Sequence, residues 1–376
     1  MKKKRLEKKH RKSVRNRNWE DKNKHDFAFT HDLVKHRRAV VKLPETPPNL
    51  NPLPSNFEPN ATVIAHSKKW AFVQLAGKEQ LCLIDERLKE ERSTLLAPGD
   101  AVLVEFEARD AIVRGVAPRR TKLSRPAGEH GRLAEQVVAA NADLLVVVAA
   151  TVRPPFRLGL VDRFLIAAEV GGVEPILCVN KMDLVEEEPE AVRLYRSLDL
   201  RVFLTSCETG DGIGALRDAL RGKVSVLAGH SGVGKSSLLN AMDPHLIVHT
   251  REVSQATHRG RHATTAAHLY ELSGDIRIID TPGIRALGLW GVSAAEVAHY
   301  FPDLAQMAAA CRFRNCTHVH EPHCAVLEAV AQGSLSRLRY DSYRRIRASL
   351  ESETGMTPGR RLAGEQGPPL PEPGGP

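Results

Sequence analysis

Short hydrophobic runs follow one another closely between residues 60 and 118. Five of them stand between turn signals: ATVIAH, WAFVQL, QLCLI, DAVLVEFE and AIVRGV. Runs of this length, bounded by Gly, Pro and Asp, are typical of β-strands. Five short strands in one short segment predict a small barrel. The oligonucleotide/oligosaccharide-binding (OB) fold is the leading candidate, and an SH3-like barrel stays open.

After residue 141 the apolar runs become continuous and alternate with helical stretches. The runs are DLLVVVAA, PILCVN, RVFLTS, VSVLAG and IRIID. Helices are expected at 157–170, 187–198, 212–221 and 235–242. Strands that are buried on both faces of a parallel sheet give continuous apolar runs. The segment 125–290 is therefore predicted to be an α/β domain with helices on both faces of its sheet, followed by a helical segment at 291–350.

The charge of the chain is concentrated at its N-terminus. Residues 1–42 hold 16 Lys and Arg against five Asp and Glu, whereas the rest of the chain holds 38 against 40. A segment so rich in charge and so poor in apolar residues cannot bury a core. We interpret 1–43 as a basic disordered arm, 44–59 as a linker rich in Pro and Asn, and 351–376 as a disordered tail. The arm predicts a polyanionic partner, either nucleic acid or an anionic membrane surface.

Several features favour a cytoplasmic protein without a membrane span. The longest apolar run, 144–150, has only seven residues, whereas a helix needs roughly 20 to cross a bilayer. No apolar segment follows the basic N-terminus, as a secretory signal would require. Six cysteines in 376 residues are too few for a disulfide-built domain.

Residues 229–236 read GHSGVGKS and match the phosphate-loop pattern G-x-x-x-x-G-K-[ST]. A strand precedes them and a helix follows, which is the context that the pattern requires. In such a loop backbone N–H groups surround the β-phosphate, Lys235 reaches the β/γ oxygens and Ser236 binds Mg²⁺. The alternative is a glycine-rich turn without a ligand, which would leave Lys235 without a role. The expected nucleotide contacts are Gly229, His230, Ser231, Gly232, Val233, Gly234, Lys235, Ser236 and Ser237.

A second motif, NKMD at 180–183, ends another predicted strand. The Asp183 carboxylate can accept hydrogen bonds from N1–H and the 2-amino group of guanine, a donor pair that adenine lacks. Such a site discriminates by roughly 10⁴–10⁵, because the wrong base leaves a buried carboxylate unpaired. Asn180 would brace the loop, and a capped turn without a ligand is the alternative. The expected base contacts are Asn180, Lys181, Met182, Asp183, Ser206 and Cys207.

A third motif, DTPG at 280–283, ends the strand IRIID. An acid there can position Mg²⁺ through water, and the Gly283 N–H can sense a γ-phosphate. Asp280 and Lys235 are therefore candidate catalytic residues. In ordinary small GTPases the phosphate loop precedes NKxD, whereas here it follows. A sheet permits this order, because the site depends only on which strand ends meet in space.

This order, with GHSGVGKSS, GRHATT, DTPGIRALGLW and a later Cys/His cluster, resembles the circularly permuted GTPases of the RsgA (YjeQ) family. The resemblance covers about 60–350. It implies an OB barrel, a permuted GTPase domain and a C-terminal zinc domain. It also implies a GTP-hydrolysing factor of late 30S maturation that binds 16S rRNA, is stimulated by the small subunit and leaves on hydrolysis. We expect it to bind GTP and GDP and to act as a monomer.

Two other functions stay open on the sequence. One is a nucleotide-dependent RNA-binding switch that does not hydrolyse GTP, since Ile284 occupies the position of the usual catalytic glutamine. The other is a permuted GTPase of large-subunit assembly.

The resemblance also implies roles for the segment GRHATT. His262 would replace the glutamine as a catalytic residue, and a solvent-facing loop histidine is the alternative. The family often has three threonines here, but Ala263 departs from that pattern. Either Thr264 or Thr265 is therefore expected to contact the nucleotide's Mg²⁺.

Three cysteines and a histidine follow the pattern C-x₄-C-x-H-x₅-C at 311–324. Three thiolates and one imidazole satisfy tetrahedral Zn²⁺ and leave no open position, so a structural site is expected. The resemblance selects His318, which the sequence alone does not separate from His320 and His323. The predicted zinc ligands are Cys311, Cys316, His318 and Cys324.

The predicted helix at 334–350 interleaves arginines with Tyr340 and Tyr343. This pattern suits contact with RNA phosphates and bases, and it suits a solvated amphipathic helix equally well.

Overall fold

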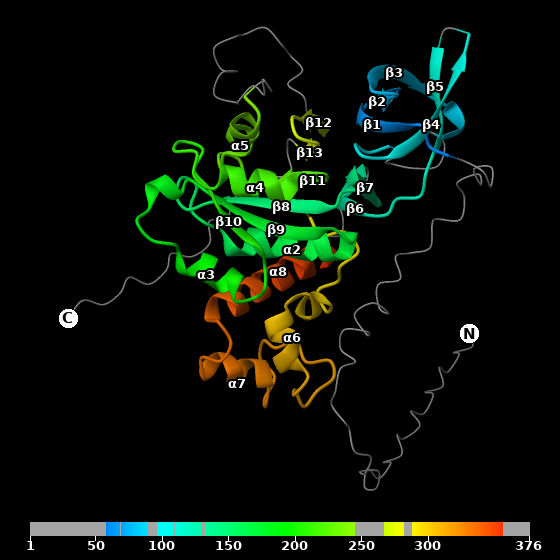
Figure 1. The fold of residues 1–376 in the computed structure, drawn as a ribbon. Helices are drawn as coiled ribbons and strands as arrows, with labels where there is room; N and C mark the ends of the chain where they lie inside the picture. The colour runs from blue at the N-terminus through cyan, green and yellow to red at the C-terminus, as the bar shows by residue number, and fades with distance from the viewer. Residues whose placement is uncertain are drawn as a thin grey trace, which may run out of the picture. The chain divides into compact units, whose positions relative to one another are not determined.

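The computed structural model describes residues 58–67, 69–88, 96–108, 110–129, 132–244, 267–281 and 288–355 (Figure 1). The predicted arm at 1–43, nearly all of the linker at 44–59 and most of the tail at 351–376 lie outside the described residues.

A closed barrel of five strands opens the described chain. The strands are β1 (Ala61–His66), β2 (Trp70–Leu75), β3 (Lys78–Ile84), β4 (Ala101–Glu107) and β5 (Asp110–Val116), with the short helix η1 (Glu86–Leu88) after β3. Their order is β1-β2-β3-β5-β4, and β3 lies parallel to β5 while the other neighbours are antiparallel. This is the OB arrangement, so the structure decides between the two barrels that the sequence left open.

The chain then forms a hairpin that the sequence analysis did not anticipate. Its strands are β6 (Lys122–Glu129) and β7 (Arg132–Ala140), which pair only with each other. Its sequence is rich in polar residues and lacks the alternation that marks a half-buried strand.

The strands that follow the hairpin form a six-stranded sheet (Figure 1). Its strands, in chain order, are β8 (Leu144–Ala150), β9 (Glu174–Asn180), β10 (Val202–Leu204), β11 (Val224–Ala228), β12 (His268–Leu272) and β13 (Ile276–Asp280). Their order in space is β10-β9-β8-β11-β13-β12, and all neighbours are parallel except β12 and β13. The predicted α/β class is confirmed, with an antiparallel edge strand, β12, that the sequence analysis missed.

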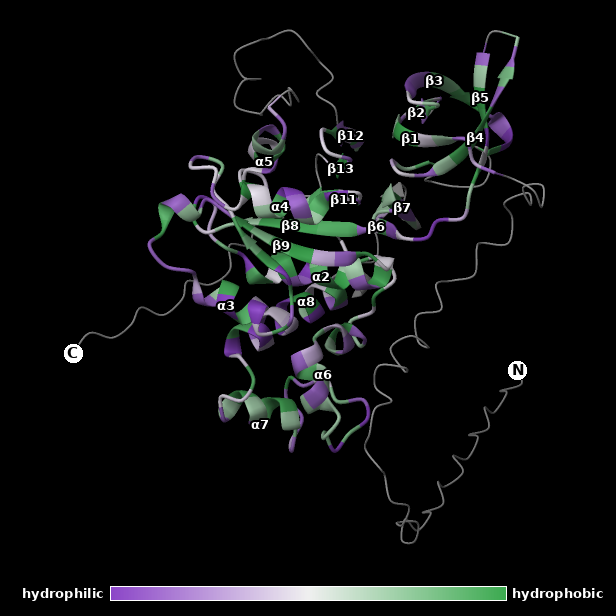
Figure 2. Cartoon of the chain, viewed as in Figure 1, coloured by the Kyte–Doolittle hydropathy of each residue, from purple (hydrophilic) through white to green (hydrophobic). Residues whose placement is uncertain are grey.

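Helices cover both faces of the sheet. They are α2 (Leu158–Gly171), α3 (Glu190–Arg196), α4 (Ile213–Leu220) and α5 (Lys235–Met242), with the short helix η2 (Met182–Leu184) after β9. Alternate residues of β8 belong to different cores: Val147 packs in the core that contains α2, and Val146 in the core that contains α4 and α5. This explains why β8 reads as an unbroken apolar run and is hydrophobic along its length in Figure 2.

The C-terminal part is helical and shares a core with the α2 side of the sheet. Its helices are η4 (Val297–Tyr300), α6 (Pro302–Ala308), α7 (Ala325–Ala331) and α8 (Arg337–Gly355). Arg339 of α8 is buried and pairs with Asp162 of α2 and Asp303 of α6. None of the helices in the described part of the chain is both long and apolar enough to cross a membrane.

Two expectations for the last helix need correction. Helix α8 runs to Gly355, past the point where the sequence analysis begins the tail, because no Gly or Pro interrupts 351–354. The aromatic residues do not face a partner: Tyr340 is 4% exposed and Tyr343 is 1% exposed. Both hydroxyls donate to carbonyls of the neighbouring Cys/His loop, so the two rings are structural.

Candidate nucleotide site and metal centre

The phosphate-loop motif lies at the carboxyl end of β11 and leads into α5. Its glycines have backbone angles that other residues avoid: φ is 151° at Gly229, 82° at Gly232 and 99° at Gly234. A β-carbon at Gly229 would lie 2.2 Å from the Val148 carbonyl oxygen. The glycines are therefore required by the path of the loop, which curls the backbone as a phosphate cradle needs.

Lys235, the first residue of α5, points back over this loop. Its Nζ donates to the carbonyl oxygens of Gly229 at 2.9 Å and His230 at 3.0 Å. Ser236 and Ser237 follow in the first turn of the helix, half-buried and exposed respectively. The ammonium group and the hydroxyl of Ser236 thus lie beside the cradle, where phosphate oxygens and a hard cation such as Mg²⁺ find suitable partners.

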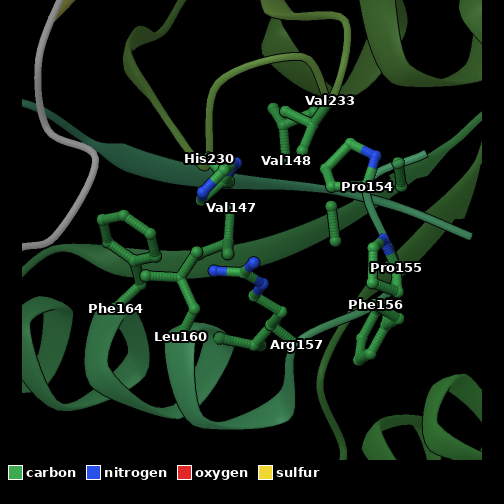
Figure 3. A pocket seen from close by; sticks show the side chains of 13 residues that line it. Val147, Val148, Pro154, Pro155, Phe156, Arg157, Leu160, Phe164, His230 and Val233 are labelled. Carbon is green, nitrogen blue, oxygen red and sulfur yellow. The ribbon is translucent and has the colours of Figure 1, made fainter. Parts of the chain in front are cut away.

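A small pocket lies between the phosphate loop and the first turns of α2 (Figure 3). His230 and Val233 of the loop face Pro154, Leu160 and Phe164 across it. Its volume of about 20 Å³ admits roughly one water molecule. The pocket therefore belongs to the packing of the loop and is far too small for a nucleotide.

Asn180 joins the NKMD motif to the phosphate loop. Its side chain is 2% exposed, and its Nδ2 donates to the Val233 carbonyl oxygen at 3.0 Å. A β-carbon at Gly234 would come within 2.3 Å of the same Nδ2. Thr205 donates its hydroxyl to Asn180 Oδ1 at 3.3 Å, which brings in the end of β10. The NKMD motif, the phosphate loop and the end of β10 thus meet at one buried amide.

The Asp183 side chain is exposed at the same edge of the sheet. Ser206 donates its hydroxyl to Asp183 Oδ1 at 2.6 Å, and the Ser206 oxygen accepts from the backbone N–H groups of Glu208 and Thr209, both at 3.2 Å. These bonds fix the carboxylate while leaving it accessible to a base. Cys207 follows, and its thiol donates to Asn180 Oδ1 at 3.5 Å.

The remaining residues of the NKMD loop are also tied in place. Lys181 has a φ of 65°, and its Nζ donates to the Arg153 carbonyl oxygen at 2.5 Å. The Thr151 hydroxyl donates to the Lys181 carbonyl oxygen at 2.8 Å, and Met182 N–H donates to the Thr205 carbonyl oxygen at 3.1 Å. The loop is therefore shaped by hydrogen bonds within the protein before any ligand arrives.

Asp280 ends β13 directly beside β11, paired in register with Leu227. Burial raises the pKa of Asp280, against the opposing charge of Lys235. Its Oδ1 is shielded from solvent and has no hydrogen-bond partner among the residues that the structure describes. A carboxylate in this state suits a hydrated cation, since oxygen ligands and their waters are what Mg²⁺ prefers.

The other residues predicted for this site fall outside the described part of the chain. They are His262, Thr264, Thr265, Gly283 and Ile284.

The four predicted zinc ligands gather in one place, with their ligand atoms within 4.8 Å of one another. Cys311 Sγ lies 3.8 Å from Cys324 Sγ, and these sulfurs lie 3.5 and 3.4 Å from His318 Nδ1. Tetrahedral zinc with Zn–S near 2.3 Å and Zn–N near 2.0 Å requires about 3.8 Å between two sulfurs and about 3.5 Å between sulfur and nitrogen. The donor set thus fits zinc, through Nδ1 of His318, with Cys316 as the fourth ligand.

The surrounding residues hold the cluster's loop in shape. Tyr340 and Tyr343 of α8 donate to the carbonyl oxygens of His318 at 2.8 Å and Thr317 at 2.7 Å. The Glu321 carboxylate accepts from Thr317 N–H at 2.6 Å, and such bonds lower the pKa of Glu321 against its burial. A metal here would crosslink the loop to α7 and leave no open position for catalysis.

Comparison with known proteins agrees with this geometry. Residues 116–290 match the family model described as RsgA GTPase. A relative from Gemmatimonas aurantiaca, named small ribosomal subunit biogenesis GTPase RsgA, is 42% identical over 290 residues, which are 75% of this chain and 94% of the relative. The chain belongs to the RsgA family of GTPases. Its curated relatives are named GTPases of small ribosomal subunit biogenesis. As a member of this family, the protein hydrolyses GTP.

Two solved structures show the same fold. The crystal structure of YjeQ from Thermotoga maritima matches with a TM-score of 0.60 and 31% identity over 80% of this chain and 99% of that one. The structure of YloQ, described as a circularly permuted GTPase, matches with a TM-score of 0.57 and 27% identity over 79% of this chain and 96% of that one. The RsgA fold class predicted from the sequence is thus confirmed.

One polar residue at this site, His268, was not predicted from the sequence, because the strand β12 that carries it was not predicted. His268 and Asp280 are partners in the β12–β13 register. The turn residues at 273–275, Ser-Gly-Asp, lie between two strand-like runs and are a hairpin signal that points to β12.

Proposed function

We propose that the protein is a GTP-hydrolysing assembly factor of late 30S maturation, which binds 16S rRNA in its GTP state and is released on hydrolysis. The observation that carries the proposal is the hydrogen bond from Asn180 to Val233, because it sets the base-recognising loop against the phosphate loop. The names of the relatives in the RsgA family support the small subunit as the target.

In this proposal the described residues bind and orient the nucleotide. Asp183 accepts the two donors of guanine, and the backbone of the phosphate loop surrounds the β-phosphate. Lys235 exchanges its carbonyl partners for phosphate oxygens, which is a stronger, charge-assisted interaction. Mg²⁺, held by the Ser236 hydroxyl and faced by Asp280 through water, would neutralise the phosphate oxygens.

Residues outside the described structure would complete the site. Thr264 or Thr265 would meet Mg²⁺ when GTP is bound, and His262 would act in hydrolysis in place of the missing glutamine, since Ile284 cannot orient water. Ordering such a segment against the γ-phosphate is how GTPases signal their state. The small subunit would accelerate hydrolysis by stabilising that ordered segment.

The outer face of the barrel supports contact with RNA. Trp70 and Phe72 of β2 are 43% and 47% exposed, and Leu81 of β3, directly paired with Phe72, is 43% exposed. Clusters of exposed apolar side chains mark binding surfaces, and aromatic rings stack on unpaired bases.

The basic arm at 1–42 would add phosphate contacts that weaken steeply with salt. The zinc segment would contribute a rigid surface, and the factor would work as a monomer in the cytoplasm.

Hydrolysis in the presence of each ribosomal subunit tests the proposal. Intrinsic GTPase rates are slow, on the order of 10⁻⁴–10⁻² s⁻¹. We expect 30S particles to raise the rate of the full chain strongly and 50S particles to leave it unchanged. Equal stimulation by both would contradict the assignment to the small subunit. GTP-dependent binding to 30S without any turnover would instead favour a switch that does not hydrolyse GTP.

A further inference from the structure

His268 stands directly opposite Asp280 across the β12–β13 hairpin. Residues that face each other in an antiparallel pair point to the same side of the sheet, with β-carbons about 5 Å apart. Asp280 is the carboxylate that the proposed function places next to Mg²⁺. A histidine in this position is therefore within reach of the carboxylate, directly or through one water molecule.

Both residues have a polar atom that is shielded from solvent and unpaired. These atoms are His268 Nδ1 and Asp280 Oδ1, which have no hydrogen-bond partner within the described ranges. Burying a polar atom without a partner costs free energy, so native structures rarely leave one unpaired. Two such atoms on an opposed pair of residues suit a hydrogen bond to each other, made directly or through one water molecule when the site is complete.

The surroundings of His268 favour a neutral imidazole with a fixed ring. The ring packs on Tyr270 with their centroids 4.5 Å apart. Burial lowers the pKa of His268, against the charge of Glu79, a polar interaction of the ring with the Leu269 backbone, and the charge of Asp280. A neutral N–H donor orients a carboxylate without cancelling the negative charge that attracts Mg²⁺.

The behaviour of Lys235 shows why an N–H donor from His268 matters for Asp280. In the structure its charge acts on Asp280 while its Nζ bonds to loop carbonyls. When Lys235 turns to phosphate oxygens, its charge acts on the nucleotide, and a second polar group is needed beside Asp280 to hold its carboxylate in one orientation. His268, anchored on the sheet, meets that need without moving.

We propose that His268 is a positioning residue of the Mg²⁺ site. Its Nδ1–H donates to Oδ1 of Asp280, directly or through a single water molecule. This bond leaves the other carboxylate oxygen of Asp280 facing the hydrated cation. This inference rests on the Mg²⁺–nucleotide site of the proposed function. It does not depend on the ribosomal partner.

Two substitutions separate the N–H donor from the packing of the ring. His268→Phe keeps an aromatic ring beside Tyr270 and removes the donor. His268→Asn removes the ring but places an amide Nδ2 at the same number of bonds from the backbone as the histidine Nδ1. The full chain is loaded with fluorescent GDP, and the rate of GDP dissociation is measured over a series of MgCl₂ concentrations and in EDTA.

We expect His268→Phe to raise the half-saturating Mg²⁺ concentration about tenfold, the effect of one hydrogen bond to a charged group. His268→Asn should stay within about threefold of wild type, because it keeps the bond to the charged carboxylate. In EDTA all three proteins should release GDP at similar rates. In an Asp280→Asn background, His268→Phe should have no further effect, since the histidine acts through that carboxylate.

The inference is overturned if His268→Phe has the Mg²⁺ dependence of wild type, if both substitutions shift it equally, or if the effects of His268→Phe and Asp280→Asn simply add. A wild-type protein whose GDP release ignores Mg²⁺ would instead contradict the metal site of the proposed function itself.

Discussion

Asn180 and Val233 are 53 residues apart in the sequence, and the side-chain amide of the first donates to the backbone carbonyl of the second at 3.0 Å. The bond joins the end of β9 to the loop after β11, two strands that are not neighbours in the sheet. It shows how a permuted chain builds an ordinary site: the strand ends meet at one edge, whatever their order along the chain. One buried amide therefore couples recognition of the base to the shape of the phosphate cradle.

Gly234→Ala should abolish tight nucleotide binding. The new β-carbon would collide with Asn180 Nδ2, and the φ of 99° is strained for any residue with a side chain. We expect the affinity for fluorescent GDP to fall by about 100-fold or more, since strain of this kind costs about 1–3 kcal/mol before the collision is added. Gly210→Ala, at another glycine of positive φ (84°) with open space around it, is the control. If both variants bind GDP alike, the contact between the two motifs does not shape the cradle.

Asp183→Asn should change the base preference of the site from guanine to xanthine. The asparagine amide keeps an acceptor for N1–H but presents an N–H₂ group to the 2-amino group of guanine, and that N–H₂ group suits the 2-keto oxygen of xanthine. We expect GDP affinity to fall by about 100-fold or more and xanthosine diphosphate binding to appear, because a mismatched polar pair that the bound base shields from water is costly. A competition titration with the two diphosphates measures both effects. Unchanged preference for GDP would show that Asp183 does not read the base.

Much of the site is visible in the sequence because its motifs are local. The phosphate loop needs glycines at fixed positions, and the structure shows why: Gly229 and Gly234 each approach another atom too closely for a β-carbon. Likewise, β8 could be predicted from its apolar run, since both of its faces are buried.

What the sequence does not reveal depends on contacts between distant segments. Tyr340 and Tyr343 look like an RNA-binding pattern, yet they are buried because the Cys/His loop folds over them. The strand β12 lies at an edge and alternates irregularly, so its role beside Asp280 emerges only when it pairs with β13. The choice of His318 over His320 and His323 likewise needs the fold, which places its Nδ1 near two sulfurs.

Cys311→Ser should lose zinc and destabilise the C-terminal segment. A tetrahedral site of three thiolates and one imidazole contributes directly to folding. We expect zinc content to fall from about one ion per chain and the melting temperature to drop by about 10 °C, which corresponds to a loss of roughly 3 kcal/mol. His320→Ala is the matched control, because His320 lies in the same loop but outside the cluster. Full zinc content in Cys311→Ser, or its loss in His320→Ala, would contradict the ligand set.

Trp70→Ala and Phe72→Ala should weaken binding to 30S particles and leave nucleotide binding unchanged. Stacking of a base on an aromatic ring contributes about 1–3 kcal/mol, so each change should lower the affinity by about tenfold. The control is Phe106→Ala, an aromatic residue of β4 that is 64% exposed on the same barrel. A loss of affinity in all three variants, or in none, would argue against a binding face on β2 and β3.

Calorimetric titration of the full chain with GDP and with ADP shows whether the permuted motifs form one guanine-nucleotide site. We expect a single tight site for GDP and an affinity for ADP that is at least about 10³-fold weaker, since adenine lacks the donor pair that Asp183 accepts. Comparable affinities for the two nucleotides would contradict this expectation.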